Sequence, residues 1–329
     1  MRSAIILGAG KGTRMKSDTP KILHTIIDRP MSRYIVDALK EAGVTRIVMV
    51  AGWKAGQVKA AFPDLEIAIQ EPQLGSGHAV MQATALEGEE GDTLVINGDG
   101  PCIQPETLEK LFEANKDASM TLLTSVLEDG AHYGRVIRKE DGSVAEIVEA
   151  RDCTPEQKKI CEINAGMYCF KTRDLFEGLT HLTTDNAQHE YYITDLAKIF
   201  NSQGKRVNAL VADDRDETMG INDKKELADA SRWIRSRIND RLMAQGVQIT
   251  DPRRTVIGKD VVIGKDVIID PDTEILGQSV LEDGVIVRSG SRIVNGIVKK
   301  GAVIDASRVY NVEVPAGSHI GPYAAQGKE

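Results

Sequence analysis

Short runs of aliphatic residues alternate with amphipathic stretches through the first 222 residues of the chain. The aliphatic runs are rich in β-branched side chains and predict strands, whereas the stretches between them repeat apolar residues every three or four positions and predict helices. The predicted strands are residues 4–7, 46–52, 65–70, 93–97 and 120–126, and the predicted helices include 31–42, 78–86 and 106–115. Strands that alternate with helices form a parallel sheet with helical crossovers, so we expect a doubly wound, Rossmann-like α/β domain.

Residues 129–170 interrupt this alternation. Residues 135–139 and 144–150 flank Asp141 and Gly142 and predict a β-hairpin, and residues 163–170 predict another strand. We interpret this segment as an insert that covers a substrate.

A six-residue period dominates the last part of the chain. Its first row holds aliphatic residues at seven successive steps: Ile257, Ile263, Ile269, Ile275, Leu281, Val287 and Ile293. The second row favours small or β-branched residues four positions on: Val261, Val267, Thr273, Ser279, Val285, Ser291, Ile297, Val303 and Val309. This period is typical of a hexapeptide β-helix, here with about four coils of ~18 residues each.

A long charged helical pattern lies between these two regions. It runs from Asp223 to Ala244 and ends near Gly246, as helices commonly do. We therefore predict a first domain of residues 1–222, a connecting helix within 223–250, and a short β-helix with a tail at 251–329.

Composition limits the kinds of partner that this chain can take. Of its 329 residues 41% are hydrophobic, and the net charge is −8, which argues against an extended nucleic-acid surface. No apolar run approaches the ~20 residues that a membrane span needs, so we expect a cytoplasmic protein without a membrane partner. The four cysteines form no CxxC pair and predict free thiols.

A glycine-rich, cationic loop follows the first predicted strand. Gly8, Gly10 and Gly12 can adopt backbone angles closed to other residues and let main-chain N–H groups approach phosphate, while Lys11, Arg14 and Lys21 supply positive charge. The spacing fits neither a Walker loop nor a dinucleotide fingerprint, which would need glycine at Thr13. The loop predicts a nucleoside triphosphate site.

This loop and later segments resemble the sugar-1-phosphate nucleotidyltransferases. The resemblance is closest to the uridylyltransferase half of the bifunctional N-acetylglucosamine-1-phosphate uridylyltransferase/glucosamine-1-phosphate acetyltransferases. The segments that carry it, in the family's order, are residues 7–15 with Pro20 and Lys21, 70–79, 98–99, 133–135, 147–149, 162–164, 186–195 and 220–222. The six-residue repeat resembles the left-handed β-helix of hexapeptide acyltransferases, which implies a homotrimer.

The resemblance implies a role for each matching residue. Arg14 and Lys21 are the implied catalytic residues, which hold the triphosphate and the incoming sugar phosphate. Asp99 and Asn222 are the implied ligands of Mg²⁺, which prefers one or two protein oxygens together with substrate phosphates. The implied nucleotide-binding residues are Leu7, Ala9, Gly10, Gln70, Gly75 and Ser76, and the implied sugar-binding residues are Gly134, Glu149 and Asn164.

The implied reaction converts UTP and N-acetylglucosamine 1-phosphate into UDP-N-acetylglucosamine and pyrophosphate. The chain departs from the family at Asn97, Gly100 and His189, where tyrosine, valine and glycine are usual, so a different sugar 1-phosphate stays open as an alternative. A catalytically silent nucleotide-sugar sensor or scaffold is a further alternative. The chain ends where the bifunctional relatives continue with further coils, and we therefore expect no acetyltransferase activity.

Overall fold

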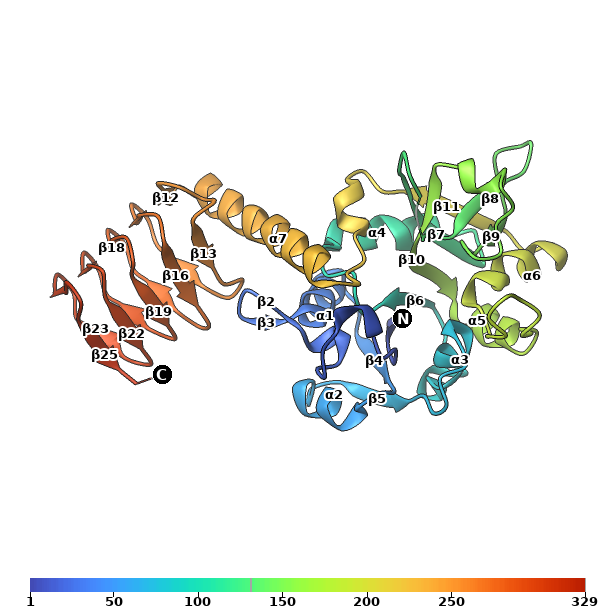
Figure 1. The fold of residues 1–329 in the computed structure, drawn as a ribbon, viewed down its shortest axis with the longest axis horizontal. Coiled ribbons are helices and arrows are strands. Elements are labelled where there is room, and N and C mark those ends of the chain that lie inside the picture. Colours follow the sequence, from blue (N-terminus) through green and yellow to red (C-terminus); the bar gives the residue numbers. More distant parts are fainter. Residues whose placement is uncertain (131, 329) are drawn as a thin grey trace. The chain divides into compact units, whose positions relative to one another are not determined.

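The computed structural model describes residues 1–130 and 132–328 of the chain (Figure 1). Contacts divide the chain into two compact units. The first holds Met1–His24 and Pro30–Glu226, and the second holds Thr25–Arg29 and the chain from Leu227 onward. In the described part of the chain, no helix has the length and apolar character that crossing a membrane requires.

The first unit is built on a nine-stranded sheet. Its main path runs β11-β7-β10-β6-β1-β4-β5, and β8 and β9 form a hairpin beside β10. The strands are β1 (Arg2–Gly8), β4 (Arg46–Ala51), β5 (Glu66–Ile69), β6 (Asp92–Asn97), β7 (Met120–Val126), β8 (Arg135–Arg138), β9 (Val144–Val148), β10 (Glu162–Lys171) and β11 (Val207–Val211). β1 pairs in parallel with both β4 and β6, so the α/β fold class expected from the alternating pattern is confirmed.

The predicted parallel pairing holds for only part of the sheet, because β10 runs antiparallel to both β6 and β7. Eight consecutive residues of β10 are buried. This strand therefore belongs to the centre of the sheet and not to the substrate-covering insert. The chain reaches it from the β8–β9 hairpin, and a hairpin returns the chain in the opposite direction.

Helices cover both faces of the sheet, as expected for a doubly wound fold (Figure 1). One buried core joins the sheet to α1 (Met31–Glu41), α2 (Ala55–Ala61) and α4 (Pro105–Ala114). The other joins it to α3 (Ser76–Met81), α5 (Thr172–Leu179) and α6 (Leu196–Ser202). Because β1, β4, β5 and β6 pair in parallel, their carboxyl ends lie at the same edge of the sheet.

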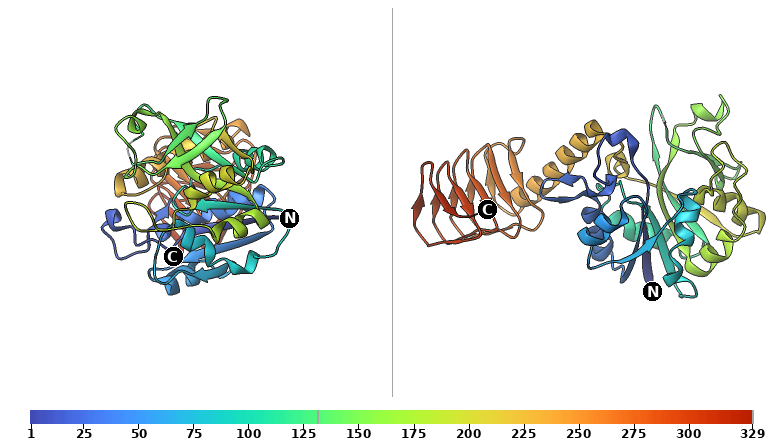
Figure 2. Two further views of the ribbon diagram at one scale, coloured as in Figure 1. Left: turned by 90° about the vertical axis from the view of Figure 1, so that its right-hand side faces the viewer. Right: turned by 60° about the horizontal axis from the view of Figure 1, so that its bottom comes forward.

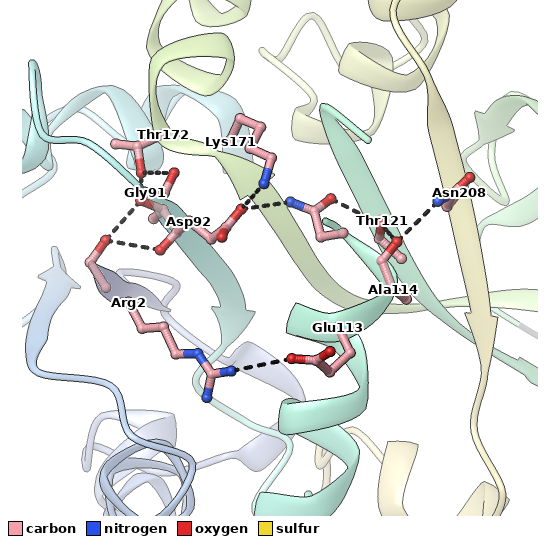
Figure 3. Close-up of polar contacts among 12 residues, drawn as sticks. Arg2, Gly91, Asp92, Glu113, Ala114, Thr121, Lys171, Thr172 and Asn208 are labelled. Atoms are coloured by element: carbon pink, nitrogen blue, oxygen red, sulfur yellow. Dashed lines mark hydrogen bonds and ion pairs between the residues drawn. The ribbon is translucent and has the colours of Figure 1, made fainter. Parts of the chain in front are cut away.

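A buried polar network closes the opposite edge, where β6 begins (Figure 3). The Asp92 carboxylate accepts hydrogen bonds from Asn115 Nδ2 at 3.0 Å and Lys171 Nζ at 2.9 Å. The carbonyl of Ala114, at the end of α4, accepts one from the Thr121 hydroxyl at 3.2 Å. These bonds satisfy polar groups that are buried or half-buried at this edge.

The second unit contains the coils of a parallel β-helix (Figure 2). Three sheets of short parallel strands follow the orders β12-β15-β18-β21-β24, β13-β16-β19-β22-β25 and β14-β17-β20-β23, consistent with a left-handed β-helix. The strands are β12 (Gln248–Ile249), β13 (Thr255–Ile257), β14 (Val262–Ile263), β15 (Ile268–Ile269), β16 (Thr273–Leu276), β17 (Val280–Leu281), β18 (Ile286–Val287), β19 (Arg292–Val294), β20 (Ile297–Val298), β21 (Val303–Ile304), β22 (Arg308–Tyr310), β23 (Glu313–Val314), β24 (His319–Ile320) and β25 (Ala325–Gly327).

Two further elements belong to the β-helix unit. Most of α7 (Lys224–Ala244) lies in it, and its buried Asn239 donates to the carbonyls of Pro252 at 2.9 Å and Thr255 at 3.0 Å. The segment between β2 (Thr25–Ile26) and β3 (Arg29–Pro30) also joins it, because the Asp28 carboxylate accepts a hydrogen bond from the Gly277 N–H at 3.0 Å.

The second of the two repeat rows loses its register after Ser291, at Ile297 and Val303, although its last member, Val309, is buried. Ile297 is 38% exposed, whereas its neighbour Val298 is fully buried. The reason is a change in coil length: Val262 pairs with Val280 eighteen residues on, but Val280 pairs with Ile297 after only seventeen. Losing one residue exchanges the inward and outward positions in β20 and β21. In β22 the shift is sixteen residues, and Val309 there pairs with Ile293 of the first row and is fully buried.

Candidate active site

The glycine-rich loop joins β1 to a short helical turn, η1 (Thr13–Met15), and its three glycines serve different purposes. A side chain at Gly8 would lie 2.6 Å from the side chain of Ile22, and at Gly12 it would lie 2.7 Å from Lys21 Cβ. At Gly10 it would meet no protein atom within 4 Å. Of the three, only Gly12 uses a positive φ, a backbone conformation that other residues seldom adopt.

Four side chains converge beside this loop. Lys21 Nζ lies 2.5 Å from Asp99 Oδ2 and donates to Asn222 Oδ1 at 2.8 Å. An Arg14 guanidinium nitrogen donates to the same Asn222 oxygen at 2.8 Å. The residues come from chain positions more than 200 apart, since Asn222 follows β11 while Arg14 lies in η1. The structure thus gathers the two implied catalytic cations and the two implied metal ligands.

The Asp99 and Asn222 side chains fit a hard divalent cation. Both offer oxygen atoms, both oxygens approach the same lysine ammonium, and the Ile221 N–H fixes the turn by donating to the Asp99 carbonyl at 2.9 Å. In the described residues no group of three or more His, Cys, Asp or Glu side chains could hold a metal ion. Two protein oxygens match the Mg²⁺ sites that substrate phosphates complete.

The segment from Gln70 to His78 forms the next wall. Gln70 is buried, and its amide nitrogen donates to the Gly75 carbonyl at 2.9 Å and pairs with His78 Nδ1 at 3.2 Å. Gly75 has φ 109°, and a side chain there would lie 2.6 Å from the Tyr191 carbonyl. Ser76 Oγ accepts a hydrogen bond from the Ile193 N–H at 3.0 Å. His78 is thus held by hydrogen bonds within its own segment, to Gln70 and Gln82.

The implied sugar-binding residues lie together around a cavity of about 230 Å³. Gly134, Glu149 and Asn164 all line it, as do Ser76, Asp99 and Asn222. Asn164 Nδ2 donates to the Tyr168 hydroxyl at 2.7 Å, and its Oδ1 accepts from the Gly166 N–H at 3.1 Å, so this amide is held in a fixed orientation. The cavity therefore opens beside the four-residue cluster.

Burial shifts the pKa of Glu149. Loss of solvent raises the pKa of its carboxyl above the usual value, and the hydrogen bond that Oε1 accepts from the Thr194 hydroxyl at 3.1 Å only partly offsets this. Burial also raises the pKa of the Tyr133 phenol, whose oxygen accepts a hydrogen bond from the Gly220 N–H at 3.4 Å.

Sequence reasoning missed several residues of the cavity wall. His132 stacks on Tyr133 with ring centroids 4.7 Å apart, and Tyr168, Met167 and Thr218 complete the lining. No short motif marks these positions, because they reach the cavity only through the pairing of β10 with β7 and the turn before Asn222. Tyr133 lies next to Gly134, in a segment that carries the family resemblance, and is the one residue of this group that the sequence could have indicated.

Comparisons with known proteins agree with this geometry. Residues 4–195 match the MobA-like NTP transferase domain, and residues 260–295 match the bacterial transferase hexapeptide model of six repeats. The chain is 40% identical to the bifunctional protein GlmU of Clostridium novyi, 41% to that of Listeria monocytogenes and 42% to that of Exiguobacterium sibiricum. Each alignment covers 98% of this chain and 72% of the relative.

The chain belongs to the GlmU family. Its membership and its NTP transferase domain make it a sugar-1-phosphate nucleotidyltransferase, as the resemblance predicted. The departures from the GlmU pattern can now be placed: Asn97 and Gly100 line the 230 Å³ cavity, whereas His189 is not among the described lining residues.

Proposed function

We propose that this chain transfers UMP from UTP to N-acetylglucosamine 1-phosphate, with release of pyrophosphate and in the presence of Mg²⁺. The observation that carries the proposal is the convergence of Arg14 and Lys21 on Asn222, beside Asp99 and the cavity that Glu149 and Asn164 line. GlmU relatives support sugar-phosphate uridylyl transfer; the sugar and the metal are our assignment.

The reaction needs positioning and charge stabilisation more than proton transfer. An oxygen of the sugar phosphate attacks the α-phosphorus of UTP, a new P–O bond forms, and the bond to the β-phosphate breaks with its electron pair leaving on pyrophosphate. The attacking phosphate is already ionised, so no general base is required. Arg14 and Lys21 stabilise the negative charge that spreads over the oxygens in the transition state.

Asp99 and Asn222 would hold the divalent cation. When bound, Mg²⁺ would neutralise charge on the triphosphate and favour departure of pyrophosphate. Lys21 contacts both residues and keeps their oxygens close together. The sugar would occupy the cavity, where the Glu149 carboxyl and the fixed Asn164 amide offer hydrogen-bonding partners to its hydroxyl and acetamido groups.

A different sugar 1-phosphate is the second candidate substrate. Asn97 and Gly100 lie in the cavity lining and support this alternative, since both differ from the usual residues of the family. Turnover with a panel of sugar 1-phosphates separates the two: release of pyrophosphate with N-acetylglucosamine 1-phosphate supports the main proposal, and release only with another sugar supports the alternative.

The decisive experiment measures pyrophosphate release by the purified chain with UTP, Mg²⁺ and N-acetylglucosamine 1-phosphate. Asp99→Ala should lower turnover by about 1,000-fold or more while the melting temperature changes little, because the carboxylate is partly solvent-exposed and serves a polar cluster. Glu66→Ala, at an exposed ion pair away from the site, is the matched control. Near-normal turnover of the Asp99 variant would contradict the metal assignment, and binding without any turnover would favour a sensor.

Two further expectations accompany the proposal. We propose assembly as a homotrimer through the β-helix, supported by the hexapeptide match. Sedimentation at several protein concentrations tests this assembly. The absence of acetyl transfer stays a prediction, and thiol release from acetyl-coenzyme A with glucosamine 1-phosphate would contradict it.

A further inference from the structure

The turn after β4 is tied to the glycine-rich loop at three points. The Trp53 N–H donates to the Ala9 carbonyl at 3.2 Å, and Lys54 Nζ donates to the Asp18 carbonyl at 2.5 Å. The Lys11 ammonium lies 5.8 Å from the centre of the Trp53 ring. Because β4 pairs directly with β1, this turn lies beside the glycine-rich loop.

Two lysine ammonium groups lie near the Trp53 indole ring. Lys54 Nζ lies 4.7 Å from the ring centre, in addition to Lys11. In the described part of the chain Lys11 has no carboxylate partner, and Lys54 reaches only Asp18, whose side chain is fully exposed, at 4.0 Å. Lys54 also has φ 53°, a left-handed conformation that non-glycine residues seldom adopt. We call Lys11, Trp53 and Lys54 the indole clamp.

Strand order places the indole clamp on a particular side of the reaction centre. The order β6-β1-β4 puts the glycine-rich loop of β1 between Asp99, which follows β6, and Trp53, which follows β4. Asp99 borders the cavity proposed for the sugar. In-line displacement requires the leaving oxygen to lie opposite the attacking one. The departing end of the triphosphate would therefore lie away from that cavity, and the clamp stands on the opposite side of the loop from Asp99.

We propose that the indole clamp binds the β- and γ-phosphates of the nucleoside triphosphate. Trp53 acts as a positioning residue: its π face holds the Lys11 and Lys54 ammonium groups at the loop, where they attract the polyphosphate tail. This inference rests on the proposed function, because it assumes that UTP is the nucleotide and that pyrophosphate is the leaving group.

Calorimetric titration with UTP and with UMP tests the clamp. Loss of a cation–π contact at an exposed site corresponds to a factor of about 2 to 5. Trp53→Leu should therefore raise the Kd for UTP about 2- to 5-fold and leave the Kd for UMP unchanged, since UMP lacks the tail. Trp53→Phe keeps a π face and should restore the UTP affinity. Lys54→Ala should resemble Trp53→Leu, and Lys59→Ala, an exposed lysine in α2, is the matched control.

A spectroscopic measurement complements the titration. In a Trp233→Phe background Trp53 is the sole tryptophan, and saturating UTP should change its emission more than saturating UMP does. Melting temperatures establish whether each variant is folded. If Trp53→Leu does not fold, the UTP and UMP affinities of Lys54→Ala test the clamp instead.

Each outcome separates the clamp from the proposed function. Unchanged UTP affinity in folded Trp53→Leu and Lys54→Ala, with normal pyrophosphate release, overturns the clamp alone. Equal weakening of UTP and UMP shows a general effect on the loop and overturns the assignment to the phosphate tail. If the unmodified chain binds neither nucleotide, the proposed function fails together with the clamp.

Discussion

Gly10 offers the sharpest test of the nucleotide site, because the protein itself has no visible need for a glycine there. An added Cβ would meet no protein atom within 4 Å, and the residue is exposed at the end of the loop. Its φ is not among the positive values, so alanine is compatible with the backbone. Gly10→Ala should therefore leave the free energy of unfolding unchanged or raise it by up to about 1 kcal/mol.

Gly10→Ala is instead expected to weaken the binding of UTP. A phosphate oxygen that accepts a main-chain hydrogen bond at this position must move away from a new methyl group. Losing one charge-assisted hydrogen bond costs about 1.5–3 kcal/mol, which corresponds to a loss of about 10- to 150-fold in UTP affinity.

Gly12→Ala is the informative comparison for this variant. Gly12 has φ 62°, and its added Cβ would lie 2.7 Å from Lys21 Cβ, so the substitution strains the loop and displaces a proposed catalytic lysine. We expect it to lower stability by about 1–2 kcal/mol and to reduce kcat as well as affinity.

Thermal unfolding, UTP titration and pyrophosphate release measure the three quantities for both variants. An affinity of Gly10→Ala for UTP within twofold of the unmodified chain would refute the reasoning, since it would mean that no phosphate approaches this part of the loop. A fall in stability as large as that of Gly12→Ala would refute it from the other side, because the backbone would then need glycine at position 10 for its own conformation.

Three other predictions follow from buried groups. Because burial raises the pKa of Glu149, the folded chain binds the proton of this carboxyl more tightly than the unfolded chain does. The free energy of unfolding should therefore fall as pH rises above about 4.5. Thermal melts between pH 4.5 and 7.5 should show this loss, and Glu149→Gln should not. Val298→Ala should destabilise the β-helix by about 2 kcal/mol and Ile297→Ala by less than 1 in denaturant titrations, and equal effects would contradict the shifted register. Asn239→Ala should cost about 2–4 kcal/mol by the same measurement, because two carbonyls lose their donor.

The strands of the first unit could be predicted because burial on both faces leaves a continuous aliphatic run. The predicted strand at residues 120–126 coincides with β7, and that at 93–97 falls within β6. The short helices α2 and α6, seven residues each, were not predicted, since so few residues show hardly two helical turns of periodicity. The direction of β10 could not be predicted either, because an aliphatic run has the same pattern in a parallel and an antiparallel strand.

The repeat shows where a periodic argument fails. Six-residue steps hold as long as each coil has eighteen residues, and the rows through Ser291 are accordingly confirmed apart from Ile263, which is half-buried. From β20 onward the coils shorten to sixteen or seventeen residues. A missing residue in a turn leaves no hydrophobic signal of its own, so the shift becomes visible only when the neighbouring strands are paired.

The residues of the candidate site could be predicted from the sequence, but the structural role of each one could not. The sequence treated Gly8, Gly10 and Gly12 as one phosphate-binding motif, yet a side chain at the first would have to displace the end of Ile22, and the third lies in a left-handed turn. A motif records that glycine is required and not what would collide with a side chain. The distinction has a consequence for mutation: a substitution at Gly12 strains the loop and one at Gly8 shifts Ile22, so a loss of activity there would not report on phosphate binding alone. Among these three positions only Gly10 separates the two effects, because the space around it is empty of protein and remains available to a ligand.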